Sequence, residues 1–382
     1  MTGGGSGGHI TPLLSLAREL KKAKPQCRVV YVGLKGDRLD GLQDRYEVFD
    51  QVCYIAAGKF RRYHGESFLA HLIDVKTILL NFRDFFRTII GVYSAGKILK
   101  KIGPAVVFSK GGFVAVPVGI AAHRARIPIV THDSDASAGL SNRILGRWAA
   151  VHTTGMPPEM YNYPPATTRF VGVPIDERIQ AVTPARQVDF KSQIGIMPES
   201  LVLLAVGGGL GSQNINKLLL EAAPRLLKQA PNLFIVHITG RQHQAEVLAD
   251  YNAQLAPLLR QRVKVIGFSG ELYKYSGAAD IVITRAGATA LAELAVQGKA
   301  CIVIPSAFLS GGHQLLNAQS LADAAKILTD NVTTEEFVAT VNQLIKDRAL
   351  RLQLAQRMAA RAKPEAASTL AKVLLEVAGA GV

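Results

Sequence analysis

A chain of 382 residues is long enough for two domains of ordinary size, each able to bury a substantial core. Hydrophobic residues make up 48% and charged residues 19%, which excludes long disordered segments. The formal net charge is +15, and residues 1–172 carry +11 of it through 23 Lys and Arg against 12 Asp and Glu. A positive first half favours anionic partners such as a diphosphate or a phospholipid surface.

Other patterns narrow the class of protein further. Cys27, Cys53 and Cys301 lie far apart without metal-type spacing, as expected for reduced thiols in a cytoplasmic protein. The sequence shows no signal peptide and no apolar run of about 18 residues, so we expect no segment that spans a membrane. It also shows no recognition-helix or zinc-finger spacing, so we do not expect nucleic acid as a partner.

The chain opens with the glycine-rich stretch Gly3 to Gly8, which formally matches the dinucleotide pattern GxGxxG. That pattern needs a preceding strand, and only residues 1–2 stand before the glycines. We therefore interpret Gly7 to His9 as a different loop, one that presents an imidazole, followed by a helix with Pro12 near its first turn. We also expect that the first strand of this domain is missing from the chain and that translation begins upstream of the present start.

The segment from Gly58 to Lys110 contains ten Lys and Arg among many apolar residues. Apolar residues with basic flanks are typical of an interfacial helix that lies on a membrane. The alternative is two helices that pack on a sheet and expose their charges to solvent. The candidates for membrane contact are Lys76, Leu79, Phe82, Arg83, Phe86 and Arg87.

Short apolar runs predict the strands of the first half, at 28–32, 105–108, 129–131, 151–154 and 169–171. Polar residues follow two of them, where open α/β sheets bind ligands. Gly111 and Gly112 follow the second run, and the third is followed by His132, Asp133, Asp135 and Asn142. Asp133 and Asp135 form a DxD, a tripeptide that can hold a divalent metal, but one such tripeptide is a common accident and we expect no metal.

The second half begins with Leu201 to Asn216, which predicts a buried strand, a glycine turn and the start of a helix. A helix amino end left open by such a turn is an anion site, although the same turn could merely pack. Further strands are predicted at 233–239, 263–266, 281–284 and 301–304, alternating with helical patterns. This alternation predicts a parallel sheet with helices on both faces.

A second helix start is predicted at Arg285 to Thr289. Glu293 falls six residues after Gly287, under two helical turns along. This spacing suits a phosphate at the helix start and a carboxylate that bonds a ribose diol. For Glu293 alone, the alternative is an ordinary residue on a helix surface.

Six segments together, in order and spacing, resemble the MurG family of peptidoglycan glycosyltransferases in glycosyltransferase family 28: TGGGSGGHITP, SKGGFVAVP, HDSDASAGLSN, AVGGGLGSQNIN, TRAGATALAE and HQLLNAQ. The resemblance implies the GT-B fold, in which two Rossmann-like domains face a cleft. It also implies transfer of N-acetylglucosamine from UDP-N-acetylglucosamine to lipid I, which makes lipid II for the cell wall at the cytoplasmic face of the membrane.

The resemblance divides the chain into an acceptor and membrane-binding domain at 1–172 and a donor-binding domain at 173–359, with a final helix over about 360–382 that can pack back on the first. It implies acceptor contacts by Ser6, Gly7, Gly8, Gly111, Gly112 and the residues from His132 to Asn142. It implies donor contacts by Gly208, Gly209, Gly211, Ala288, Thr289, Ala290, Glu293, Gln314 and Asn317.

The family reaction inverts the sugar in one displacement, which requires a base for the acceptor 4-hydroxyl. His9 suits this role because imidazole titrates near neutral pH. Helix amino ends suit the stabilisation of the leaving UDP, without a metal or another cofactor. The chain departs from the family pattern at Asp133, where glutamate is usual, at Val173 and Asp176, where asparagine and arginine are usual, and at His313, which replaces a glutamine.

Three alternative functions compete with transfer of N-acetylglucosamine to lipid I. One is a related glycosyltransferase that uses a UDP-sugar and diacylglycerol. Another is a non-catalytic member that only binds a partner at the membrane. The third is an NAD-binding oxidoreductase, which rests on the GxGxxG match.

Overall fold

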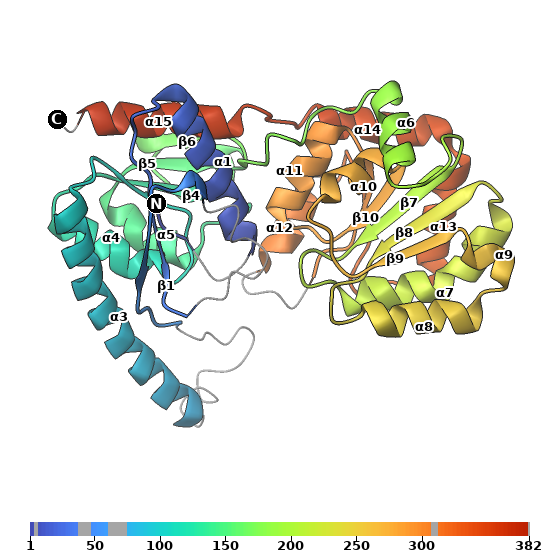
Figure 1. Cartoon of the computed structure of the whole chain (residues 1–382), viewed down its shortest axis with the longest axis horizontal. Helices are drawn as coiled ribbons and strands as arrows, with labels where there is room; N and C mark the ends of the chain where they lie inside the picture. Colours follow the sequence, from blue (N-terminus) through green and yellow to red (C-terminus); the bar gives the residue numbers. More distant parts are fainter. Residues whose placement is uncertain (4–6, 37–46, 60–74, 307–311, 381–382) are drawn as a thin grey trace. The chain divides into compact units, whose positions relative to one another are not determined.

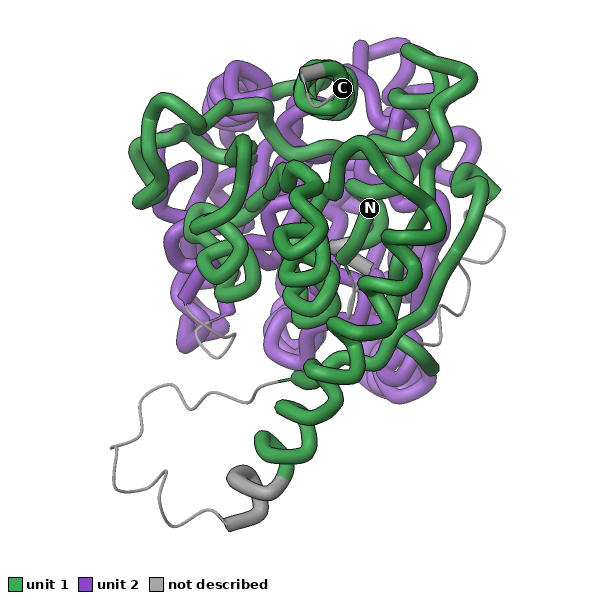
Figure 2. Tube along the Cα trace, turned by 90° about the vertical axis from the view of Figure 1, so that its left-hand side faces the viewer, with its two compact units in different colours: residues 1–176, 363–382 green, residues 177–362 purple. Residues whose placement is uncertain are grey.

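The structure is a computed structural model that describes residues 1–3, 7–36, 47–59, 75–306 and 312–380 (Figure 1). The chain divides into two compact units. Unit 1 comprises Met1–Asp176 and Lys363–Val382, and unit 2 comprises Glu177–Ala362 (Figure 2). Each unit is an α/β fold built around a parallel sheet, so the predicted fold class is confirmed.

The sheet of unit 1 contains two groups of parallel strands. β1 (Val30–Leu34) pairs with β2 (Gln51–Ile55). The second group, in sheet order, is β3 (Val107–Ser109), β4 (Ile129–Asp133), β5 (Ala149–Thr154) and β6 (Thr168–Phe170). Thr2 forms parallel bridges to both Val32 and Ser109, and its backbone N–H donates to Phe108 O at 2.9 Å. Residues 1–2 therefore occupy the position between β1 and β3 where the innermost strand was expected.

Helices cover both faces of this sheet. α1 (Gly7–Ala23) and α15 (Ala366–Ala380) pack together on one face, over a core that includes Leu13, Phe108 and Leu370. α3 (Val75–Ile102) and α4 (Ala115–Arg124) cover the other face, while the short α5 (Leu140–Leu145) follows β4. Successive strand residues such as Val107 and Phe108 enter different cores because side chains alternate along a strand.

Several predictions of local structure were wrong in detail. Gly7 to His9 form the first turn of α1 rather than a loop, which places Pro12 inside the helix. Pro12 is the sixth residue of α1, so the helix lacks the one hydrogen bond that an N–H at this position would donate. Residues 75–102 form one helix, and residues 60–74 of the predicted basic and apolar segment lie outside the described residues. The predictions missed β2, although Val52 to Ile55 are apolar.

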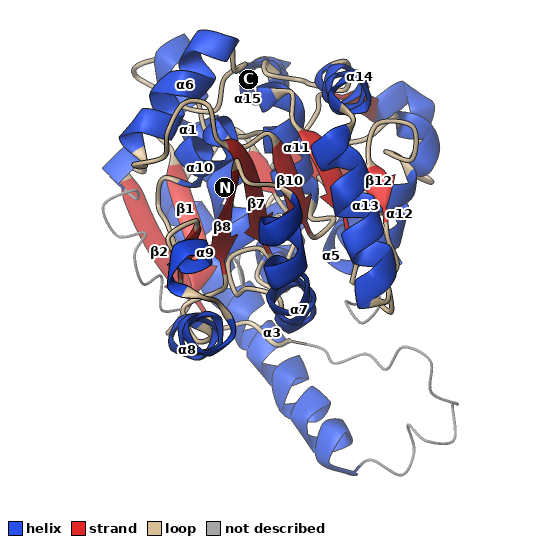
Figure 3. Cartoon of the chain, turned by 90° about the vertical axis from the view of Figure 1, so that its right-hand side faces the viewer, coloured by secondary structure: helices blue, strands red, loops and turns tan. Residues whose placement is uncertain are grey.

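Unit 2 contains a six-stranded parallel sheet in the order β12-β11-β10-β7-β8-β9 (Figure 3). The strands are β7 (Leu201–Val206), β8 (Leu233–Ile238), β9 (Val263–Ile266), β10 (Ile281–Thr284), β11 (Ala300–Val303) and β12 (Lys326–Ile327). The first five confirm the predicted strands to within about one residue. β12 was not predicted, since two residues leave no pattern.

The helices of unit 2 form two layers around the sheet (Figure 3). One layer contains α7 (Gln213–Gln229), α8 (Gln244–Gln254), α9 (Pro257–Arg260) and α13 (Thr334–Lys346). The other contains α6 (Pro184–Gln193), α10 (Leu272–Ala278), α11 (Ala288–Gln297) and α12 (His313–Gln319), and α14 (Arg348–Ala359) contributes side chains to both cores. The chain leaves β7 toward β8 on one side and returns to β10 on the other, so the carboxyl ends of β7 and β10 mark the switch point where such sheets bind ligands.

Candidate functional site

The glycine turn after β7 has a backbone that only glycine supports. Gly208 and Gly211 have φ angles of +89° and +81°. A Cβ on Gly211 would collide with the carbonyl oxygen of Thr239. By contrast, a Cβ on Gly208 or Gly209 would meet no atom within 4 Å, so this side of the turn is open for the close approach of a ligand.

Ser212 begins α7 and joins the turn to the next strand. Its Oγ accepts a hydrogen bond from Ile215 N at 3.3 Å, which is an N-cap contact. The same oxygen accepts from Arg285 Nε at 3.0 Å. Arg285 follows β10, and its Nη1 also donates to Ile304 O at 3.0 Å and to Asp330 Oδ1 at 2.6 Å. The sequence placed Arg285 at a helix start but did not predict this ion pair.

The amino end of α11 lies after β10, the strand that pairs directly with β7. Gly287 is its N-cap and provides no side-chain hydrogen bond. Ala288, Thr289 and Ala290 form the first turn of α11, whose N–H groups have no partner within the helix. Two helices of 17 and 10 residues therefore begin after neighbouring strands of the sheet.

The remaining donor candidates lie on α11 and α12. Glu293 is half-buried on the second turn of α11. Gln314 is buried and accepts from Ser306 N at 2.9 Å, while Asn317 is fully buried and donates to Ala286 O at 2.9 Å. Asn317 thus supports the turn that leads into α11. Direct contact of either side chain with a sugar stays a prediction.

A buried polar network, which the sequence analysis did not predict, supports the glycine turn after β7. His237 Nε2 lies 3.0 Å from Asn216 Oδ1, and its Nδ1 lies 3.1 Å from the Tyr251 hydroxyl. Asn216 Nδ2 donates to Thr239 O at 3.0 Å, the carbonyl against which Gly211 packs. Burial lowers the pKa of His237 to about 3, so its ring is neutral at physiological pH.

In unit 1, Asp133 connects the segments that follow β4. Its Oδ1 accepts from Gly139 N at 2.9 Å and from Asn142 Nδ2 at 3.1 Å, and its Oδ2 accepts from the Tyr163 hydroxyl at 2.7 Å. Asp135 is half-buried two residues further on. Burial raises the pKa of Asp133, although these hydrogen bonds act in the opposite direction.

His132 is fully buried beside this group. Its two ring nitrogens lie 3.0 Å from Thr153 Oγ1 and 3.1 Å from Ser134 Oγ, and burial holds its pKa well below the usual range. The structure therefore gives His132 a supporting position, and a direct contact with the acceptor stays a prediction.

Gly111 and Gly112 turn the chain after β3, with φ angles of +88° and +79°. Gly111 N donates to Ser109 Oγ at 3.2 Å, and that hydroxyl donates to Asn142 Oδ1 at 2.8 Å. Asn142 is fully buried and thus links this turn to Asp133. The predicted acceptor residues after β3 and β4 form one connected group.

The first glycine loop is described only in part. Gly7, Gly8 and His9 have helical backbones in the first turn of α1, and their side chains lie outside what the structure describes. Ser6 also lies outside the described residues. The catalytic role of His9 stays a prediction.

The predicted membrane segment includes an exposed apolar surface on α3. Six of its large side chains are between 48% and 66% exposed: Phe82, Phe85, Phe86, Ile89, Ile90 and Tyr93. Arg83 and Arg87 both pair with the buried carboxylate of Asp84, at 3.2 and 3.7 Å. Lys76 and Leu79 lie on the same helix, but their side chains are not among those described.

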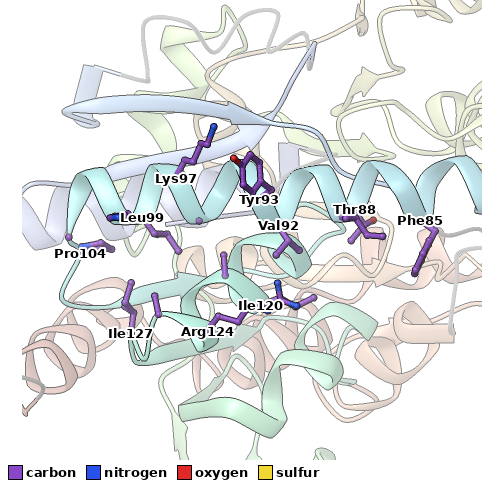
Figure 4. A pocket seen from close by; sticks show the side chains of 16 residues that line it. Phe85, Thr88, Val92, Tyr93, Lys97, Leu99, Pro104, Ile120, Arg124 and Ile127 are labelled. Atoms are coloured by element: carbon purple, nitrogen blue, oxygen red, sulfur yellow. The ribbon is translucent and has the colours of Figure 1, made fainter.

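A pocket of about 1090 Å³ lies between α3, α4 and the segment after each (Figure 4). Apolar side chains such as Val92, Leu99 and Ile127 line it. Lys97, Lys100 and Arg124 add positive charge to the lining. No helix in the described ranges is long and apolar enough to cross a membrane.

Comparisons with known proteins agree over both units. Residues 1–153 match the glycosyltransferase family 28 N-terminal domain, and residues 202–373 match the glycosyltransferase family 28 C-terminal domain. The chain is 35% identical over 323 residues, 84% of the chain and 82% of the relative, to the UDP-N-acetylglucosamine–N-acetylmuramyl-(pentapeptide) pyrophosphoryl-undecaprenol N-acetylglucosamine transferase of Lachnoclostridium phytofermentans.

The protein of the same name in Halothermothrix orenii is 33% identical over 99% of the chain and 98% of the relative. The crystal structure of Acinetobacter baumannii MurG superimposes with a TM-score of 0.71 at 27% identity, over 98% of each chain. These matches extend over nearly the whole length of the chain, and the chain belongs to the MurG family of glycosyltransferase family 28.

Proposed function

We propose that the protein transfers N-acetylglucosamine from UDP-N-acetylglucosamine to lipid I, the undecaprenyl-diphospho-muramoyl-pentapeptide, and thereby forms lipid II. Its relatives carry the name of this activity, and the chain matches them over both halves. The reaction would take place at the cytoplasmic face of the membrane, where the protein would bind peripherally.

The proposal rests mainly on two helix amino ends that follow neighbouring strands of unit 2. α7 begins after β7 and α11 begins after the neighbouring β10, both at the carboxyl edge of the sheet. Two helix amino ends provide N–H groups and positive dipole ends for the two phosphates of a nucleotide sugar. The open side of Gly208 and Gly209 leaves room for a ligand at the same edge.

The proposed chemistry is a single displacement at the sugar. The acceptor 4-hydroxyl attacks C1 of N-acetylglucosamine as the bond from C1 to the UDP oxygen breaks, and His9 accepts the hydroxyl proton. The amides of α7 and α11 stabilise the negative charge that develops on UDP. Glu293 accepts hydrogen bonds from the ribose hydroxyls, and the connected group around Asp133 in unit 1 binds the acceptor.

The exposed apolar side chains of α3 support peripheral membrane binding. Aromatic and aliphatic residues can enter the interface, while nearby Lys and Arg attract anionic headgroups. A lipid-linked acceptor would then reach the protein from the membrane surface.

The test is a transfer assay with purified protein and labelled UDP-N-acetylglucosamine. Lipid I in detergent and diacylglycerol are offered separately, each with and without EDTA. The proposal predicts labelled lipid II from the first acceptor, no product from the second and no effect of EDTA. Product from diacylglycerol alone would assign the protein to the related lipid glycosyltransferases. Absence of transfer to either acceptor, with UDP-N-acetylglucosamine still bound, would favour a non-catalytic member.

A further inference from the structure

Lys110 is a buried cation at the carboxyl end of β3. It follows Ser109, and its side chain is only 6% exposed. Within the described parts of the chain, Lys110 Nζ forms neither a hydrogen bond nor an ion pair. An ammonium on a mostly buried residue loses part of its hydration, and here no hydrogen bond to the protein replaces it.

Backbone contacts show which side of the sheet Lys110 occupies. Lys110 N donates to Thr2 O at 2.9 Å, and a Cβ placed on Gly3 would lie 3.0 Å from Lys110 Cβ and 3.3 Å from Leu13 Cδ1. Leu13 belongs to α1, so the Lys110 side chain starts on the face that α1 covers. It therefore lies beside Gly3, on the face of the sheet that α1 covers.

The charges around Lys110 do not neutralise it through direct contact. Asp133 uses its oxygens to accept hydrogen bonds from Gly139, Asn142 and Tyr163. Asp135 and Asp133 are near enough to raise the pKa of Lys110, yet burial acts more strongly and lowers it. The charge of Lys110 in turn lowers the pKa of His132, which is already kept neutral by burial.

The end of α1 adds to this positive potential. The first turn of a helix carries a partial positive charge on its free N–H groups, and α1 begins at Gly7. An ammonium beside the amino end of a helix is repelled by its partial positive charge. The arrangement becomes favourable when an anion binds between the ammonium and the helix end. The position of Lys110 therefore suits a ligand with phosphate-type oxygens.

We propose that Lys110 is an anion-binding residue of the acceptor site, whose ammonium pairs with the diphosphate of the lipid-linked acceptor. The assignment to the acceptor rests on the proposed function, because unit 1 is the acceptor-binding unit in that reaction. It also gives a physical reason for the preference between acceptors, since diacylglycerol carries no phosphate for Lys110 to bind.

The first experiment measures anion binding without any transfer. Binding of inorganic pyrophosphate is followed by calorimetry with saturating UDP present, so that the donor site is already occupied. Lys110→Met should weaken pyrophosphate binding by about 10- to 100-fold, the effect of one charge-assisted hydrogen bond, while Lys110→Arg should retain most of it. Lys24→Met, which removes an exposed charge from the same unit, is the control and should bind as the parent does.

The melting temperature without ligand separates binding from structural support. Lys110→Met should melt at or above the parent temperature, because the ammonium it removes has no partner in the free protein. Equal pyrophosphate affinity in Lys110→Met and the parent would overturn the proposal, and so would a parent that binds no pyrophosphate beside UDP.

The second experiment identifies the source of the phosphate by kinetics. Lys110→Met should raise the KM for lipid I at least about tenfold and leave the KM for UDP-N-acetylglucosamine within twofold. The opposite pattern would assign Lys110 to the donor and refute the acceptor assignment. If the parent performs no transfer but Lys110→Met still loses pyrophosphate binding, the proposed function fails while the anion site stands.

Discussion

Arg285 Nη1 donates to Asp330 Oδ1 at 2.6 Å, which ties the carboxyl end of β10 to the loop after β12. Asn214 on the first turn of α7 donates to the same oxygen at 2.7 Å. The side chains of Arg285 and Asp330 are mostly buried. Because Arg285 also reaches Ser212, this carboxylate fixes the starts of both strand-to-helix connections that we assign to the donor phosphates.

Asp330→Ala should lower the free energy of unfolding by about 3 kcal/mol, because it leaves the buried guanidinium of Arg285 without its counterion. It should also weaken UDP binding, since Ser212 and Asn214 lose their common support. Urea denaturation and calorimetry with UDP measure the two effects. The matched control is Asp323→Ala, whose pair with Arg361 is exposed, so its loss should lower the free energy of unfolding much less. Equal losses in the two variants would contradict this account.

Apolar runs were enough to predict most strands, because a buried parallel strand must be apolar along its length. Leu201–Val206 and Ile281–Thr284 were recognised in this way. Gln51–Ile55 was missed, although Val52 to Ile55 form a short apolar run. The glycine turn could be predicted from composition, whereas the Arg285–Asp330 pair joins residues 45 positions apart and only the fold brings them together. Similarly, no local pattern distinguishes buried Lys110 from the exposed lysines of the same unit.

His237 should make unit 2 less stable in acid. Its pKa is about 3 in the folded protein and about 6.5 when unfolded, so the unfolded state binds more protons between these values. Stability should therefore fall as pH decreases from 6.5, by about 1.4 kcal/mol per pH unit well below 6.5. His237→Gln removes the titrating group and should flatten the denaturation midpoint between pH 6.5 and 4.5. An unchanged slope in this variant would show that other groups dominate.

His9→Ala should lower kcat by about 10² or more, as expected for loss of a general base. UDP affinity should stay near that of the parent because we assign the donor site to unit 2. Steady-state kinetics with lipid I and calorimetry with UDP provide the two measurements. A variant that keeps the parent kcat and only raises the KM for the acceptor would make His9 a hydrogen-bonding residue instead.

Glu293→Gln should weaken binding of UDP-N-acetylglucosamine by about 1 to 3 kcal/mol, because in the proposed role a neutral amide replaces the charged acceptor of the ribose hydroxyls. Folding should be little affected, since Glu293 is only half-buried on α11. Comparison of UDP with a 2′,3′-dideoxy analogue isolates the ribose contact. The role fails if the substitution weakens binding of both nucleotides equally.

Lys97 and Lys100 provide the sharpest test of membrane binding, because Arg83 and Arg87 already pair with Asp84 and their substitution would disturb a buried carboxylate. Both lysines line the pocket between α3 and α4, and Lys97 Nζ lies 4.5 Å from the ring centre of Tyr93 (Figure 4). Each basic residue near an anionic surface contributes about 1 kcal/mol, so Lys97→Gln with Lys100→Gln should reduce partitioning into anionic vesicles about 30-fold.

The control is Lys24→Gln with Lys228→Gln, which removes the same charge from exposed sites elsewhere. Vesicle sedimentation at low salt measures the difference, which should shrink at high salt because the attraction is screened. Transfer to a soluble acceptor analogue should persist in both double variants. Equal sedimentation of the two would show that net charge alone, and not the pocket on α3, brings the protein to the membrane.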